Sequence, residues 1–228
     1  VVSTVNPAFI EIVQRLPKAD LHCHLDGSLR PSTLLELSVE RGLALPESTA
    51  SALGAWMRVD DARHLEDYLA RFEVTLAAMQ DAVALERIAH EFVLDAALDG
   101  VRYIEARFCP ALNVRGGLSL DEVMQAVLRG LARGQKETGT LARVIVCALR
   151  SIAWPHALEM AELAVAFQGK GVVAFDLAGG ELGNPASDHA LAFDFARQHD
   201  LAVTVHAGEG DGPASIREAL HQCGAHRI

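Results

Sequence analysis

Two histidines separated by one residue form the most specific chemical signal in this sequence. His22 and His24 flank Cys23 near the end of a short apolar segment. If that segment is a strand, side chains at i and i+2 project to the same side, so the two imidazoles converge while Cys23 projects the opposite way. Two imidazole nitrogens about 2.0–2.1 Å from a common centre suit a zinc ion. The alternative is two ordinary histidines at a strand end, because an H-x-H pair arises easily by chance.

A third histidine ends another apolar segment, and a glutamate follows it. At the same end of a sheet, His206 would complete a three-ligand site with open positions, as catalytic zinc sites have. A partly desolvated carboxyl group at Glu209 could stay protonated and act as a general acid. The alternative is a solvated loop residue. The glycines at 208, 210 and 212 also suggest a phosphate-binding loop, but their spacing fits neither G-x-G-x-x-G nor a P-loop.

Other polar residues and glycines also follow predicted strands. Gly179 and Gly180 would let a flat ligand approach the backbone closely. Asp176, at the end of the same strand, needs a partner if it is buried, and we expect Arg150 at the neighbouring strand end to provide it.

An apolar stripe lies between the first two predicted strands. Tyr68, Leu69 and Phe72 occupy positions i, i+1 and i+4 of a predicted helix. Such a stripe is usually part of a core, although in an inserted helix it could also cover a pocket.

Short apolar, β-branched segments alternate with helical patterns along the chain. The predicted strands are 19–24, 101–108, 143–149, 171–177 and 201–206, and the predicted helices are 31–40, 65–79, 82–98, 120–137, 156–167, 188–199 and 213–222. This order predicts an α/β fold with a parallel sheet, and the nearly continuous apolar runs indicate strands buried on both faces. A doubly wound sheet and a barrel both fit. The polar residues at the carboxyl ends of several strands favour a barrel.

Length, charge and cysteine content restrict the class of protein further. The chain has 228 residues, enough for one large domain or two small ones, and a formal net charge of −10, which argues against a nucleic-acid partner. No apolar stretch approaches the length of a membrane span, and residues 1–10 carry no signal-peptide pattern. The four cysteines are scattered, which favours reduced thiols and a cytoplasmic location.

Four segments together carry a family resemblance. They are LPKADLHCHLDGSL at 16–29, YIEARF at 103–108, AFDLAG at 174–179 and TVHAGE at 204–209. In their order and spacing they resemble the adenosine deaminase family, within the metal-dependent amidohydrolase barrels. Each motif alone has low specificity for the family, but the ordered set is specific and spans almost the whole chain.

The resemblance implies a (β/α)₈ TIM-type barrel of the metal-dependent hydrolase type. Residues 1–228 would form a single catalytic barrel domain, truncated at its C-terminal end, with the first five to six βα units. One Zn²⁺ per chain would be bound by His22, His24 and His206. Glu209 would protonate the purine N1, and the substrate would be contacted by His24, Asp26, Gly179, Tyr68, Leu69 and Phe72, with Asp26 at the ribose.

The implied reaction is hydrolytic deamination of adenosine, or a closely related 6-aminopurine nucleoside, to inosine and ammonia by a zinc-activated water. Related adenine deaminases tend to have Ile-Glu-Gly where this chain has Leu25-Asp26-Gly27, which favours a nucleoside over a free base. The signature of the cytidine-type deaminases, H-x-E with P-C-x-x-C, is absent. We expect a small-molecule purine nucleoside as the partner, with neither nucleic acid nor membrane. The sequence does not indicate an oligomeric state.

The family would continue after residue 228 with a Gly-His-Gly segment and later an Asp-Asp pair that includes another metal ligand. We therefore expect the natural protein to exceed about 300 residues, and the 228-residue chain alone to bind zinc weakly and be nearly inactive. Three alternatives remain: another amidohydrolase-type metal hydrolase such as a phosphoesterase, a deaminase of a modified nucleoside, and a non-catalytic interaction protein on the same scaffold.

Overall fold

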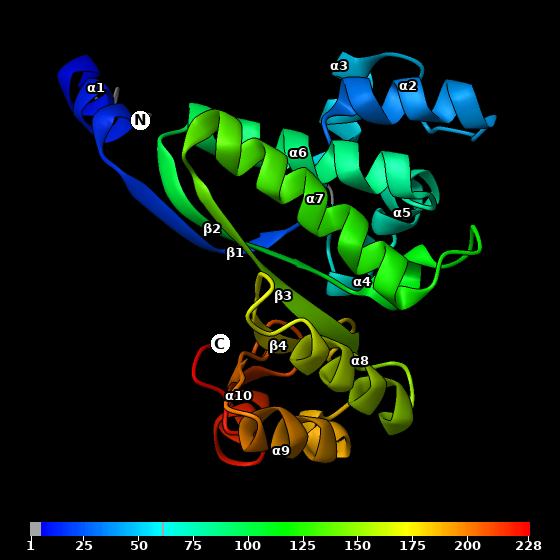
Figure 1. Cartoon of the computed structure of the whole chain (residues 1–228), viewed down its shortest axis with the longest axis vertical. Helices are drawn as coiled ribbons and strands as arrows, with labels where there is room; N and C mark the ends of the chain where they lie inside the picture. The colour runs from blue at the N-terminus through cyan, green and yellow to red at the C-terminus, as the bar shows by residue number, and fades with distance from the viewer. Residues whose placement is uncertain (1–5, 61) are drawn as a thin grey trace.

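Five parallel strands form one sheet in which spatial order equals chain order, β1-β2-β3-β4-β5. The computed structural model describes residues 6–60 and 62–228. The strands are β1 (Lys18–His24), β2 (Val101–Phe108), β3 (Leu141–Leu149), β4 (Val172–Ala178) and β5 (Ala202–Val203). Helices connect consecutive strands and lie outside the sheet (Figure 1). This topology confirms the predicted succession of βα units, and it is the arrangement of a partial α/β barrel.

The helices largely follow the predicted segments. Their bounds are α1 (Pro7–Arg15), α2 (Pro31–Arg41), α3 (Ala50–Met57), α4 (Leu65–Leu69), α5 (Phe72–Ala78), α6 (Ala82–Leu98), α7 (Leu120–Thr138), α8 (Trp154–Ala166), α9 (Ala190–Gln198) and α10 (Gly212–His221), with 3₁₀ turns at η1 (Pro110–Asn113) and η2 (Ala186–His189). Ser119 and Glu122, which have the S-x-x-E spacing that predicts a capping box, form one at the start of α7. Helices α1 and α3 had not been predicted.

The predicted helix 65–79 is wrong in one respect, because the chain divides it into α4 and α5. Arg71 lies at the junction, where its Nη1 donates a hydrogen bond to the carbonyl oxygen of Trp56 at 2.6 Å. Its guanidinium also lies over the Trp56 ring, 4.2 Å from the centroid. This tertiary contact stabilises the interruption between α4 and α5, which no proline or glycine marks in the sequence.

The last strand is shorter than predicted, although the chain beyond it stays beside β4. The backbone N–H of Thr204 donates to Phe175, and that of His206 donates to Leu177, at 2.9 and 3.1 Å. Thr204 also forms an isolated parallel bridge with Arg227. The segment 204–206 is therefore positioned by β4 without being a regular strand.

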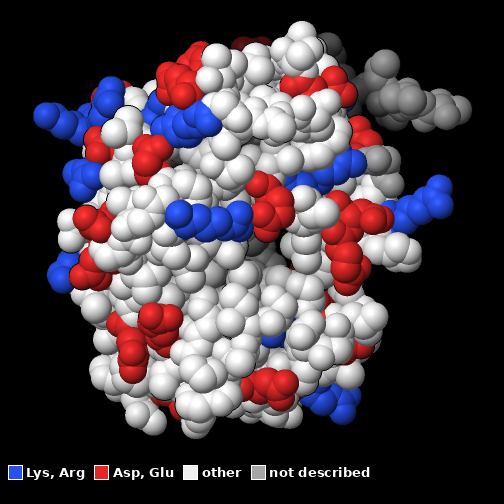
Figure 2. Space-filling model, turned by 90° about the vertical axis from the view of Figure 1, so that its right-hand side faces the viewer, with Lys and Arg blue, Asp and Glu red and all other residues white. Residues whose placement is uncertain are grey.

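Burial differs between the strands. Most residues of β2, β3 and β4 are buried, as predicted for a sheet covered on both sides, whereas β1 is largely half-buried or exposed. Acidic and basic side chains are interspersed over the face shown in Figure 2. Within the described residues, no helix is long and apolar enough to cross a membrane.

Candidate metal centre and pocket

Three imidazoles meet at the carboxyl ends of the strands. His22 and His24 end β1, and His206 follows β5. The Nε2 atom of His206 lies 3.0 Å from Nε2 of His22 and 3.0 Å from Nε2 of His24. Nitrogen ligands at 2.0–2.1 Å around a tetrahedral zinc are about 3.3 Å apart. The spacing is therefore close to that of a zinc coordination sphere.

The protonation of the two β1 histidines also suits a metal. Burial, together with the positive charges of Arg107 and His206, lowers the pKa of His22 to about 4 and that of His24 to about 3. Both imidazoles are neutral at pH 7, which is the form that binds a metal ion. The donor set and its protonation fit zinc.

A buried carboxylate orients the third imidazole. Oδ2 of Asp176, which is fully buried, lies 3.0 Å from Nδ1 of His206. Burial opposes protonation of His206, but the Asp176 carboxylate outweighs it and raises the pKa of the imidazole. With its Nδ1 directed at a carboxylate, His206 presents Nε2 to the cluster, an arrangement common behind metal-ligating histidines.

The prediction that Arg150 pairs with Asp176 is wrong. Arg107 on β2 makes this ion pair, with its Nη1 donating to Oδ2 at 3.0 Å, and Nη2 donating to the carbonyl of Leu21 at 2.9 Å. Arg150 instead donates to two carbonyls, those of Asn184 and His206. The distinction depends on which side chains project inward from neighbouring strands, which the sequence alone did not reveal.

A cavity of about 670 Å³ opens beside the three histidines, a size typical of small-molecule sites. Every residue expected at the site lines it: His22, His24, Asp26, Tyr68, Leu69, Phe72, Gly179, His206 and Glu209. Gly179 has a φ of +97°, a conformation that favours glycine, at the turn after β4.

The apolar stripe from α4 and α5 lies over this cavity and is not sealed in the core. Tyr68 is 42% exposed, and its ring meets that of Phe72 edge-on with centroids 5.2 Å apart. Phe72 in turn lies edge-on to His24, with centroids 6.1 Å apart. An apolar wall thus extends from the solvent to the metal cluster.

Asp26 is the most unusual carboxyl group at the site. It is 7% exposed, and its Oδ1 has no hydrogen-bond partner among the described residues. Burial raises the pKa of Asp26 to about 7, against the effect of two backbone hydrogen bonds. A buried polar atom without a partner, in a residue that lines the cavity, is suited to a ligand group.

Glu209 lies at the rim of the cavity, on the loop between β5 and α10. Its side chain is exposed, so the structure does not show the partial desolvation expected of it. The amides around it do bind an anion, although the spacing of the glycines argued against a phosphate-binding loop. However, the anion is the carboxylate of Glu181, which accepts hydrogen bonds from the N–H groups of Gly208, Gly210 and Asp211. No motif in the sequence points to this role of Glu181.

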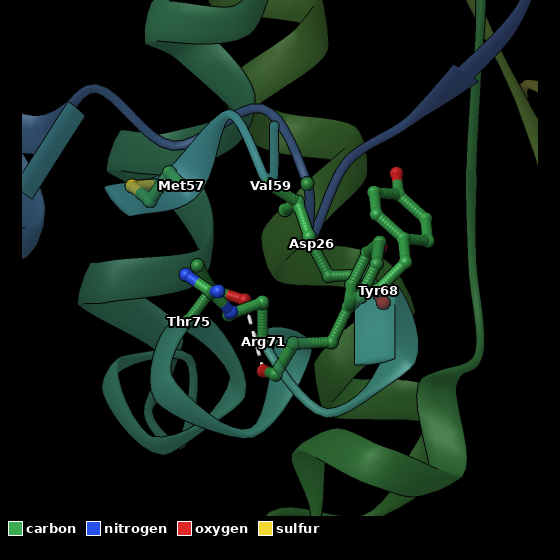
Figure 3. Close-up of a pocket in the computed structure, with 8 residues that line it drawn as sticks. Asp26, Met57, Val59, Tyr68, Arg71 and Thr75 are labelled. Atoms are coloured by element: carbon green, nitrogen blue, oxygen red, sulfur yellow. Dashed lines mark hydrogen bonds between the residues drawn. The ribbon is translucent and has the colours of Figure 1, made fainter. Parts of the chain in front are cut away.

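A second, much smaller cavity of about 40 Å³ adjoins the first at Asp26 and Tyr68 (Figure 3). The other lining residues labelled in the figure are Met57, Val59, Arg71 and Thr75. Arg71 brings a cation to this cavity, although its guanidinium is already engaged with Trp56.

A partial α/β barrel with three imidazoles converging at its strand ends has the architecture of a metal-dependent hydrolase. The family model for adenosine deaminase matches residues 17–228. An adenosine deaminase of Mycobacterium avium is 45% identical over 227 residues, which cover 97% of this chain and 62% of the relative. The chain belongs to the adenosine deaminase family.

Solved structures agree with this assignment. A zinc-bound amidohydrolase from Burkholderia ambifaria has a TM-score of 0.86 at 25% identity, and the match covers 100% of this chain and 62% of that one. An arabidopsis N6-mAMP deaminase has a TM-score of 0.82 at 32% identity, covering 96% of this chain and 66% of that one. The chain thus spans about 62% of the length of the curated relative it matches.

Proposed function

We propose that this chain provides the zinc centre and much of the purine pocket of an adenosine deaminase, within a single catalytic domain. The observation that carries the proposal is the convergence of His22, His24 and His206 beside a cavity of about 670 Å³. The reaction is adenosine + H₂O → inosine + NH₃. Four free cysteines agree with the proposed cytoplasmic location.

The three imidazoles would hold one Zn²⁺ per chain. When bound, zinc lowers the pKa of a coordinated water toward about 7 and so supplies hydroxide at neutral pH. His22 and His24 contribute neutral nitrogens, and Asp176 keeps the ring of His206 in its orientation.

The remaining residues have roles that match their positions. Glu209 donates a proton to the purine N1, so that C6 can accept the attacking oxygen and then release ammonia. Asp26 accepts a hydrogen bond from a ribose hydroxyl, which its unpartnered Oδ1 supports. The backbone of Gly179 contacts the purine edge, while Tyr68, Leu69 and Phe72 cover the apolar faces of the nucleoside.

The lining of the large cavity favours a nucleoside over a nucleotide. Among the described residues that line it there is no Lys or Arg, whereas Asp26, Glu73 and Glu209 are acidic. A phosphate group beside these carboxylates would lack a counter-charge, and like-charge contacts in a binding site cost several kcal/mol. Arg71 lines the smaller cavity, and its guanidinium is engaged with Trp56.

A substrate panel with the zinc-loaded protein from the complete reading frame tests the proposal. We expect turnover of adenosine, with kcat/KM for AMP, N6-methyl-AMP and adenine at least about 10-fold lower. Glu209→Gln should lower kcat by about 10²–10⁴-fold while zinc content stays unchanged.

Glu86→Gln is the matched control, because Glu86 pairs with Arg129 on the outer surface, and it should leave kcat unchanged. Preference for a nucleotide would overturn the substrate assignment. Hydrolysis of a phosphate ester in place of adenosine would favour another metal hydrolase. The absence of turnover with every substrate in the panel would favour the non-catalytic interaction protein.

A further inference from the structure

A buried carboxylate fastens the loop that carries Glu209. Glu181, in the loop after β4, is 3% exposed. Its Oε1 accepts hydrogen bonds from the N–H of Gly208 at 2.7 Å and from the hydroxyl of Ser215, and its Oε2 accepts from the N–H of Gly210 at 2.5 Å and of Asp211 at 3.1 Å. Four donors on both sides of Glu209 thus converge on one side chain.

The electrostatics of this contact favour an ionised carboxylate. Burial by itself raises the pKa of Glu181, but the hydrogen bonds from the Ser215 hydroxyl and the three amides outweigh it, and the pKa is lowered. Ser215 lies in the first turn and a half of α10, whose N-terminus carries unpaired N–H groups and partial positive charge. A carboxylate from elsewhere in the chain occupies the place of a bound anion.

The loop could not keep this shape with ordinary residues throughout. Gly208 has a φ of +86°, and a Cβ there would lie 2.6 Å from Cδ1 of Ile216. At Gly210 a Cβ would lie 3.5 Å from Cβ of Glu181, an ordinary contact, so the requirement for glycine applies to position 208. Such turns place successive N–H groups on one concave side, where an anion can be bound.

Glu181 also connects this loop to the other wall of the pocket. It follows Gly179 and Gly180 directly, and both of these glycines line the large cavity. Asn184, a little further on, donates its side-chain Nδ2 to the carbonyl of Gly180 at 3.0 Å, and Arg150 donates to the carbonyl of Asn184 at 2.8 Å. These bonds hold the segment that carries Glu181 in place, so that Glu181 offers the Glu209 loop a fixed point of attachment.

We propose that Glu181 is a positioning residue that fixes the loop 207–211, so that the carboxyl group of Glu209 is held over the metal site. Glu181 does not touch the reacting atoms and acts through Glu209. The inference rests on the proposed role of Glu209 in deamination.

A double-mutant cycle with Glu209 tests the catalytic part, again with the zinc-loaded protein from the complete reading frame. Glu181→Gln keeps the size of the side chain but turns an NH₂ group toward N–H donors, so the loop must shift. Because a displacement of about 1 Å can cost about 10²-fold, we expect kcat to fall about 10–100-fold, with KM and zinc content changed less than about 3-fold. In a Glu209→Gln background the same substitution should cost less than about 2-fold.

Ser215→Ala is the milder second variant, since three amides still hold Glu181, and we expect kcat to fall less than about 5-fold. Glu86→Gln is again the surface control. A loss for Glu181→Gln that is equally large in the Glu209→Gln background would overturn the proposal, because Glu181 would then act independently of Glu209. Unchanged kcat in Glu181→Gln would overturn it as well.

Hydrogen exchange tests the fastening of the loop without any reaction. In Glu181→Gln, the amides of 208–211 should exchange at least about 10-fold faster, while those of α6 keep their wild-type rates. Unchanged protection in 208–211 would refute the fastening even if adenosine is deaminated. Faster exchange in a protein that does not deaminate adenosine would instead show that the proposed function has failed and the fastening has not.

Discussion

At the scale of single residues, the chemistry depends on a buried chain of contacts behind the metal site. Arg107 pairs with Asp176, and Asp176 in turn orients His206. Asp176→Asn removes the charge that compensates the Arg107 guanidinium, which is 1% exposed. We expect the free energy of unfolding to fall by about 3–5 kcal/mol and zinc affinity to fall about 10–100-fold.

Urea unfolding of the metal-free protein and chelator competition measure these two effects separately. The matched control is Glu86→Gln, which breaks a solvent-exposed pair with Arg129 and should cost less than about 1 kcal/mol. Wild-type zinc affinity in Asp176→Asn would show that His206 does not depend on this carboxylate for its orientation.

At the scale of elements, α6 and α7 pack closely because two glycines of α7 face α6. A Cβ at Gly130 would lie 2.2 Å from the carbonyl oxygen of Glu86 and 2.8 Å from Cβ of Ala89, and a Cβ at Gly134 would lie 2.5 Å from Cβ of Val93. Helix propensity alone favours Gly130→Ala by about 1 kcal/mol. Because the obstacle is backbone that must move, we expect net destabilisation by about 1–2 kcal/mol, measured by urea unfolding.

The comparison is Ala132→Gly at an exposed position of the same helix. That change should lose about 1 kcal/mol through propensity alone. Opposite substitutions would then both destabilise α7, one through packing and the other through helix propensity. A stabilised Gly130→Ala protein would contradict the close approach of the two helices.

At the scale of the whole molecule, the metal would join opposite edges of the described sheet. His22 lies on β1 and His206 beyond β5, 184 residues apart in the chain. An ion that binds only the folded state stabilises it, by about 2.7 kcal/mol when free zinc is 100 times its dissociation constant. We therefore expect zinc to raise the unfolding midpoint of the complete protein.

His206→Ala should abolish most of this rise, and Mg²⁺ should not replace zinc because it prefers oxygen ligands. Equal stabilisation of wild type and His206→Ala by zinc would place the ion elsewhere. Thermal unfolding with and without chelator gives the measurement.

Most of the architecture was predictable from local pattern. The continuous apolar runs of β2 to β4 and the capping box of Ser119 and Glu122 are properties of neighbouring residues, and the structure confirms them. The division of the predicted helix 65–79 was not predictable, because it depends on the contact of Arg71 with Trp56, 15 residues away.

The sequence by itself determined the succession of βα units, the H-x-H pair on β1 and the family to which the chain belongs. These follow from spacing along the chain, since strand alternation places His22 and His24 on one side. Tertiary structure decided which side chains meet. Arg107, and not Arg150, pairs with Asp176, and the carboxylate of Glu181 accepts hydrogen bonds from the backbone amides around Glu209. The physical reason is that charge pairing and hydrogen bonding act over a few ångströms of space, whatever the separation in sequence.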